Sequence, residues 1–174
     1  MPAAKPKILI TDREVYLNEV QLVELGNITL RDLAAGETVR LNERLSLTPL
    51  LVPHRDELSE TVGFVVQGPR SSVAWLPDID RWGRWSRPVE DLVREVDVAY
   101  LDGTFYGEGE IDRPMSEVPH PCIEESMERL SALAEHERAR VHFVHFNHTN
   151  PAIRDDSPET ATVRSRGFRL ARRG

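Results

Sequence analysis

The sequence is poor in cysteine and in long apolar runs. Cys122 is the single cysteine among 174 residues, so no disulfide can form within the chain, and a reducing compartment is expected. No apolar run approaches the roughly 20 residues that a membrane-spanning helix needs. The first residues also lack the apolar segment of a signal peptide. From these absences we expect a cytoplasmic protein without a membrane partner.

Positive charge is also scarce. The sequence has 22 Lys and Arg against 29 Asp and Glu, which gives a net charge of −7. Because a nucleic-acid backbone is bound by a basic face, general nucleic-acid binding is not expected. The hydrophobic fraction of 40% and the charged fraction of 29% are typical of a globular protein, and no internal repeat is present. We therefore expect residues 1–174 to form a single domain.

The hydrophobic pattern predicts β-hairpins followed by alternating strands and helices, which indicates an α/β fold. Residues 105–119 contain glycine and proline and predict a long irregular segment, which in a compact domain is usually functional. Strands are expected at 7–11, 27–33, 38–41, 45–52, 61–67, 72–76 and 96–101, from 141 onward, and at 167–170. Helices are expected at 13–25, 88–96 and 121–136, and from 157 onward.

Acidic or imidazole side chains follow four of the predicted strands. They are His54, Asp78, Asp102 and His145, and His120 adds another imidazole in a Pro-His-Pro turn before a helix. Because ligands and catalytic groups collect at the carboxyl ends of strands, we expect these side chains to converge on one crevice. Histidine and aspartate are the usual nitrogen and carboxylate ligands of zinc, manganese or iron, and an aspartate can bridge two ions.

Each of these residues also has a structural interpretation. A lone histidine after a strand is more often a hydrogen-bonded structural residue than a ligand, and Asp78 or Asp102 could cap a turn. His142 is expected to pack against the sheet. Cys122 follows a proline at a helix start, where a thiolate could be stabilised, but a buried and inert thiol is favoured because no second cysteine is present.

Several segments, taken in order, resemble the second half of the metallo-β-lactamase fold. They are residues 51–54 (LVPH), 61–64 (TVGF), 73–78 (VAWLPD), 101–105 (LDGTF), 119–121 (PHP) and 144–151 (VHFNHTNP). The branch they resemble holds tRNA 3′-processing phosphodiesterases, cyclic phosphodiesterases of phosphonate metabolism and pyrroloquinoline quinone (PQQ) biosynthesis protein B. This resemblance implies the C-terminal half of an αββα four-layer sandwich, with a mixed sheet and external helices.

The resemblance also implies roles for the site residues. His54 would bind a first metal ion, Asp78 would bridge two ions, and His145 would bind the second. His120 matches a histidine that protonates the leaving group, and Asp102 would orient and charge that imidazole.

Asn147 and His148 would form the rim of the substrate site. The implied cofactor is a divalent metal, zinc first, with manganese or iron as alternatives. The implied reaction is the attack of a metal-held hydroxide on a phosphodiester or related bond of a small molecule.

One hallmark of the fold is absent. The motif His-x-His-x-Asp-His does not occur, and no histidine precedes His54. Either the chain is the C-terminal part of a longer protein, which we favour, or it is a relative that has lost its metal site. In both cases we expect weak metal binding. The C-terminal part of a longer protein should also expose sheet edges and apolar faces, which a homodimer could cover.

Three functions therefore remain open. The first is a phosphodiesterase-like metallohydrolase, which the hydrolase-like segments around His54 and Asp78 favour, although the missing motif leaves open whether this chain alone is active. The second is an accessory role in PQQ biosynthesis or transport. The third is a non-catalytic remnant that acts as an interaction module.

Overall fold

The computed structural model describes residues 23–172, apart from 28, 30–32 and 56–59. The strand predicted at 7–11 lies outside the described residues. So do most of the helix predicted at 13–25 and most of the strand predicted at 27–33.

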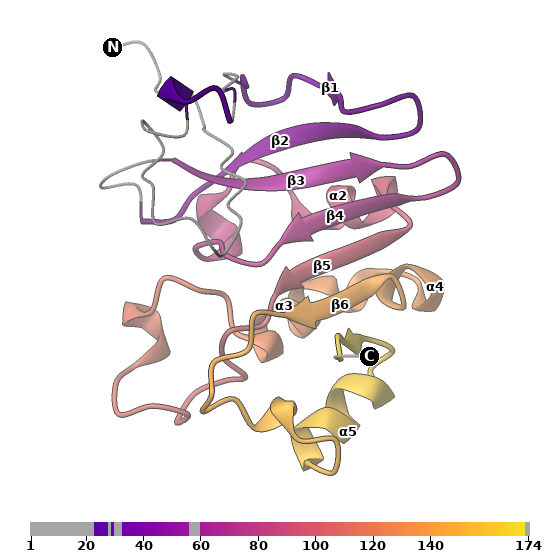
Figure 1. The fold of residues 1–174 in the computed structure, drawn as a ribbon. Coiled ribbons are helices and arrows are strands. Elements are labelled where there is room, and N and C mark those ends of the chain that lie inside the picture. The colour runs from indigo at the N-terminus through magenta and orange to yellow at the C-terminus, as the bar shows by residue number, and fades with distance from the viewer. Residues whose placement is uncertain (1–22, 28, 30–32, 56–59, 173–174) are drawn as a thin grey trace.

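The described residues form one mixed sheet of seven strands, which lie side by side in sequence order (Figure 1). Strands β1 to β4 pair antiparallel, and β4 to β7 pair parallel. The strands are β1 (Val39–Arg40), β2 (Ser46–Val52), β3 (Thr61–Gln67), β4 (Ser72–Leu76), β5 (Val98–Asp102), β6 (Val141–Val144) and β7 (Arg169–Leu170). Because β2 and β4 both run antiparallel to β3, the carboxyl ends of β2, β4, β5 and β6 meet at one edge of the sheet.

Helices follow the parallel strands. They are α2 (Val89–Glu95), α3 (Ile123–Arg129), α4 (Glu135–Arg138) and α5 (Pro158–Ser165), with single 3₁₀ turns at Trp82–Arg84, Met115–Glu117, Leu130–Ala132 and Pro151–Ile153. The start of α5 follows from its sequence, because the Ser157 side chain accepts a hydrogen bond from the Thr160 N–H at 3.1 Å and Pro158 occupies the first turn. None of the helices in the described ranges has the length and hydropathy of a bilayer-spanning segment.

The single helix predicted at 121–136 is wrong. Helix α3 ends at Arg129, one 3₁₀ turn follows, and Leu133 is extended, with φ −68° and ψ 149°. The Glu137 carboxylate then accepts the Ala134 N–H at 2.8 Å and starts α4. Leu130 and Leu133 are both buried, so the apolar spacing continues across the break and does not reveal it.

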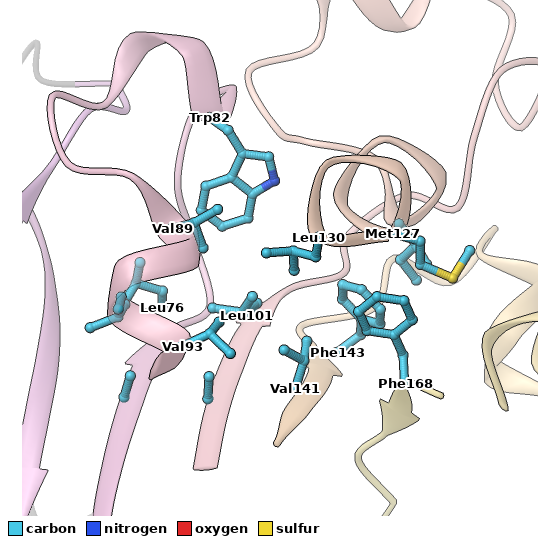
Figure 2. Packing of buried hydrophobic residues seen from close by; sticks show 14 of the residues in the cluster. Leu76, Trp82, Val89, Val93, Leu101, Met127, Leu130, Val141, Phe143 and Phe168 are labelled. Carbon is cyan, nitrogen blue, oxygen red and sulfur yellow. The ribbon is translucent and has the colours of Figure 1, made fainter. Parts of the chain in front are cut away.

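The core lies between one face of the sheet and the helices. Leu76, Leu101 and Phe143 are register neighbours on β4, β5 and β6, and each is 0% exposed. Figure 2 shows these side chains packed with Trp82 and Leu130, and α2 and α3 cover this face in Figure 1. A helix layer and a mixed sheet layer confirm the predicted α/β fold.

The opposite face of the sheet is apolar and partly open. Leu51 is 52% exposed and Trp75 is 42% exposed. The ring centroids of Trp75 and Tyr100 are 5.6 Å apart, and those of Tyr100 and His142 are 5.3 Å apart. This row of rings agrees with the predicted packing role of His142 and with the expected apolar sheet face.

Shortening a side chain to alanine should lower the free energy of unfolding by different amounts on the two faces of the sheet. Phe143→Ala removes a ring from the covered face, and we expect it to lower the free energy of unfolding by about 3–5 kcal/mol. Trp75→Ala on the open face should cost about 1 kcal/mol or less, because the ring is already in partial contact with water. Urea titration of both variants measures the difference, and equal losses would contradict a core confined to one face.

Candidate metal centre

The predicted site residues come together at the edge where the strands end. His54 follows β2, Asp78 follows β4 and His145 follows β6, while His120 comes from the irregular segment before α3. Asp78 Oδ1 lies 3.1 Å from His54 Nε2 and 3.6 Å from His120 Nδ1. The His120 ring centroid is 5.1 Å from that of His54 and 6.2 Å from that of His145.

Backbone hydrogen bonds between the strand-end loops hold this edge together. The Asp80 N–H donates to Pro53 O at 2.7 Å, which joins the loops after β4 and β2. The Gly103 N–H donates to Val144 O at 2.9 Å, which joins the ends of β5 and β6. A Cβ atom at Gly103 would lie 2.9 Å from the Phe143 Cβ, so this close approach requires glycine.

Asp102 is the buried centre of the site, with 0% exposure. Its Oδ1 accepts the Thr104 N–H at 2.8 Å and the Thr104 O–H at 2.7 Å. Its Oδ2 accepts the Ile79 N–H at 3.2 Å and lies 2.7 Å from His120 Nδ1. The carboxylate of Asp102 thus accepts four hydrogen bonds, which orient the residues that donate them. His54, Asp78 and His145 are therefore the more available metal ligands.

The charges around His120 favour its protonated form. Burial is the largest influence on the pKa of His120 and acts to lower it. The hydrogen bond to Asp102 and the negative charges of Asp102 and Asp78 together outweigh burial, so the pKa of His120 lies above the usual value of a histidine. A raised pKa suits a group that gives a proton to a leaving group.

The donor set fits a divalent cation. Two groups of three side chains each have their ligand atoms within 4.8 Å of one another. One group is His54, Asp78 and His120, and the other is Asp78, Asp102 and His145. Asp78 belongs to both groups, as a bridging ligand would. The buried atoms Asp78 Oδ1 and His54 Nδ1 have no hydrogen-bond partner. Because an unpartnered buried polar atom is costly, a cation beside Asp78 Oδ1 would remove part of this cost.

His145 has a strained backbone. Its φ is +63°, which makes it the single non-glycine residue with a positive φ in the part of the chain that the structure describes. The left-handed conformation costs roughly 1–2 kcal/mol for a residue with a Cβ. Strain of this kind persists where surrounding structure imposes it, often at functional sites.

Two residues that hold His145 or its neighbouring loops in place were not singled out in the sequence. Thr104 Oγ1 lies 3.1 Å from His145 Nδ1, and Thr104 O accepts the Asn147 N–H at 2.9 Å. Asn150, 2% exposed, donates from Nδ2 to Gly103 O at 2.8 Å. Both lie in segments whose sequences predict turns. The turn residues D-G-T after one strand and N-P after another were the sequence features that could have identified them.

The predicted rim residues, Asn147 and His148, lie in the loop that follows β6. Asn147 Nδ2 donates to Thr149 Oγ1 at 2.7 Å, and Thr149 Oγ1 donates to Glu110 Oε1 at 2.6 Å, so the Asn147 side chain braces the loop. His148 is exposed.

Burial and then the charge of Glu125 raise the pKa of the Cys122 thiol to about 12, which agrees with an inert cysteine.

Paired substitutions test the strain at His145. Both His145→Gly and His145→Ala remove the imidazole, but glycine adopts a positive φ without a steric penalty. We expect His145→Gly to be more stable than His145→Ala by about 1 kcal/mol in urea unfolding. At His148, whose φ is not positive, glycine should be the less stable member of the same pair. If both positions rank glycine and alanine alike, His145 is not strained.

Comparisons with known proteins bear on the family and the fold of this chain. Residues 4–146 match the model of the family described as the beta-lactamase superfamily domain. Coenzyme PQQ synthesis protein B of Methylorubrum extorquens (strain PA1) is 27% identical over 98% of this chain and 62% of its own length. The same protein of Azotobacter vinelandii is 28% identical over 74% of this chain and 45% of its own length. The chain thus spans about half the length of the curated relatives that it matches.

Solved structures share the fold. Zn(2+)-bound PqqB from Methylobacterium extorquens aligns with a TM-score of 0.65 and 23% identity, covering 82% of this chain and 53% of that one. Igni18, a metallo hydrolase from Ignicoccus hospitalis, aligns with a TM-score of 0.52 and 16% identity, covering 88% and 62%. The resemblance inferred from the motifs is confirmed, and the chain belongs to the beta-lactamase superfamily domain family.

Proposed function

We propose that this chain carries metal ligands and the proton-transfer pair of a divalent-metal-dependent hydrolase that acts on phosphodiester or related ester bonds of small molecules. The observation that carries the proposal is Asp78 Oδ1, a buried carboxylate oxygen without a hydrogen bond that faces two imidazoles. Zinc is the first candidate ion because histidine and aspartate are its common ligands, with manganese or iron as alternatives.

Three residues would hold the metal. His54, Asp78 and His145 come from the ends of three strands and, in contrast to Asp102, keep ligand atoms available. A bound divalent cation supplies Lewis acidity, which polarises an ester and makes water a better nucleophile near neutral pH.

His120 and Asp102 would manage the proton. The contact of 2.7 Å between His120 Nδ1 and Asp102 Oδ2 leaves Nε2 as the ring atom that can give a proton to the leaving oxygen. Because Asp102 is fully buried and accepts three further hydrogen bonds, it holds the ring in one orientation. Asn147 and His148 would contact the substrate at the rim.

A role in coenzyme PQQ synthesis is the second candidate. It is favoured by the relatives, because several proteins named coenzyme PQQ synthesis protein B match three quarters or nearly all of this chain. We expect this role to depend on the same metal ligands. Its test is whether the chain, but not its Asp78→Ala variant, restores PQQ-dependent growth to a strain that lacks this synthesis protein.

Metal titration tests the ligand set. We expect the purified chain to bind zinc in competition with a chromogenic chelator. Asp78→Ala and His145→Ala should each raise the zinc dissociation constant by at least about tenfold, because each removes one of few ligands. His136→Ala is the matched control, since this exposed histidine on α4 lies outside the site. No zinc binding, or equal losses in all three variants, would overturn the metal site.

Hydrolysis of bis(p-nitrophenyl) phosphate by the metal-loaded chain tests the reaction. His120→Ala should lower the rate by about 10²–10⁴-fold, because general acid catalysis is lost. Its zinc affinity should stay close to that of the unsubstituted chain. If zinc binds and neither this ester nor a cyclic phosphate is hydrolysed, the hydrolase proposal fails and the role in coenzyme synthesis is favoured.

A further inference from the structure

The hydroxyl of Thr104 lies between the buried carboxylate and the proposed ligand His145. Thr104 Oγ1 is 2.7 Å from Asp102 Oδ1 and 3.1 Å from His145 Nδ1. Thr104 is 8% exposed and Asp102 is 0% exposed, so water competes little for the contact between them, whereas the His145 residue is exposed.

The direction of both hydrogen bonds follows from counting protons. A threonine hydroxyl has one O–H, and a carboxylate oxygen can only accept, so the Thr104 proton points to Asp102. Toward His145 the hydroxyl oxygen can then only accept. Nδ1 of His145 must therefore carry a hydrogen, and in the neutral ring Nε2 is left with its lone pair.

The same carboxylate acts on His120 directly. Asp102 Oδ2 lies 2.7 Å from His120 Nδ1, so this ring also carries its hydrogen on Nδ1. One buried carboxylate thus determines the tautomers of two rings whose centroids are 6.2 Å apart, one by contact and one through a hydroxyl.

The backbone keeps the Thr104 hydroxyl in place. Thr104 N–H donates to Asp102 Oδ1 at 2.8 Å, and Thr104 O accepts the Asn147 N–H at 2.9 Å. The side chain is therefore held between the end of β5 and the loop after β6, where His145 has its positive φ.

We propose that Thr104 is a positioning residue that relays the buried Asp102 to His145 and presents the bare Nε2 of His145 to the metal. The part of this inference that concerns metal binding rests on the proposed function. The assignment of the tautomer concerns the metal-free chain and can be tested separately.

The first test is the ¹⁵N–¹H correlation spectrum of the histidine rings in the metal-free chain, recorded at a pH where the rings are neutral. We expect both His145 and His120 to carry the hydrogen on Nδ1. In Thr104→Val, which removes the hydroxyl, His145 should become a mixture of tautomers while His120, which contacts Asp102 directly, stays unchanged. Thr104→Ser keeps the hydroxyl and should restore the His145 pattern.

The second test is the zinc dissociation constant of the same variants. Thr104→Val should raise it by about tenfold or more, the usual effect of removing a group that orients a ligand, and Thr104→Ser should stay near the unsubstituted chain. Thr162→Val is the control, because its exposed hydroxyl donates within α5 to Pro158 O.

The outcomes separate the two proposals. A hydrogen on Nε2 of His145 in the unsubstituted chain overturns the inference, even if Thr104→Val does not fold. Zinc affinity that is equal in Thr104→Val and the unsubstituted chain also overturns it. If the tautomers behave as expected but the unsubstituted chain binds no zinc, the proposed function fails while the role of Thr104 in orienting the ring stands.

Discussion

The hydrogen bonds of one buried carboxylate, Asp102, organise the end of the sheet. Because Asp102 is fully buried, its charge is tolerable only with donors around it, and backbone or side-chain donors come from the loops after β4 and β5 and from the segment before α3. Each carboxylate oxygen has two of these donors, and losing any one of them would remove part of the compensation for the buried charge. This constraint fixes the positions of Ile79, Thr104 and His120 relative to one another, and the candidate metal centre is assembled around them.

The site combines a rigid support with polar atoms that lack partners. Asp102 accepts four hydrogen bonds, whereas Asp78 Oδ1 and His54 Nδ1 are buried without one. His145 adds a strained backbone. Stability alone would favour neither the unpartnered atoms nor the strained backbone, because each costs free energy. Their combination at one sheet edge is what a protein with a metal-dependent function would retain.

Much of the fold was predictable because burial leaves a local pattern. The strands predicted at 45–52, 61–67 and 72–76 agree with β2, β3 and β4 within a residue, since apolar and β-branched runs report strands that pack on a core. The break between α3 and α4 was not predictable, because Leu130 and Leu133 keep a helical spacing while the Glu137 side chain caps a new helix. Thr104 and Asn150 were missed as site residues because their partners lie more than 40 positions away along the chain.

By itself, the sequence determined the order of strands and helices, the apolar faces and the set of histidines and aspartates that follow the strands. These properties depend on neighbours along the chain, which periodicity and turn residues report. The sequence also predicted that His54, Asp78, Asp102 and His145 converge. Only the tertiary structure decided the distances between them, and that Asp102 accepts four hydrogen bonds while Asp78 Oδ1 accepts none. These features depend on strand pairing and on hydrogen bonds between distant segments, and no local pattern encodes such distances.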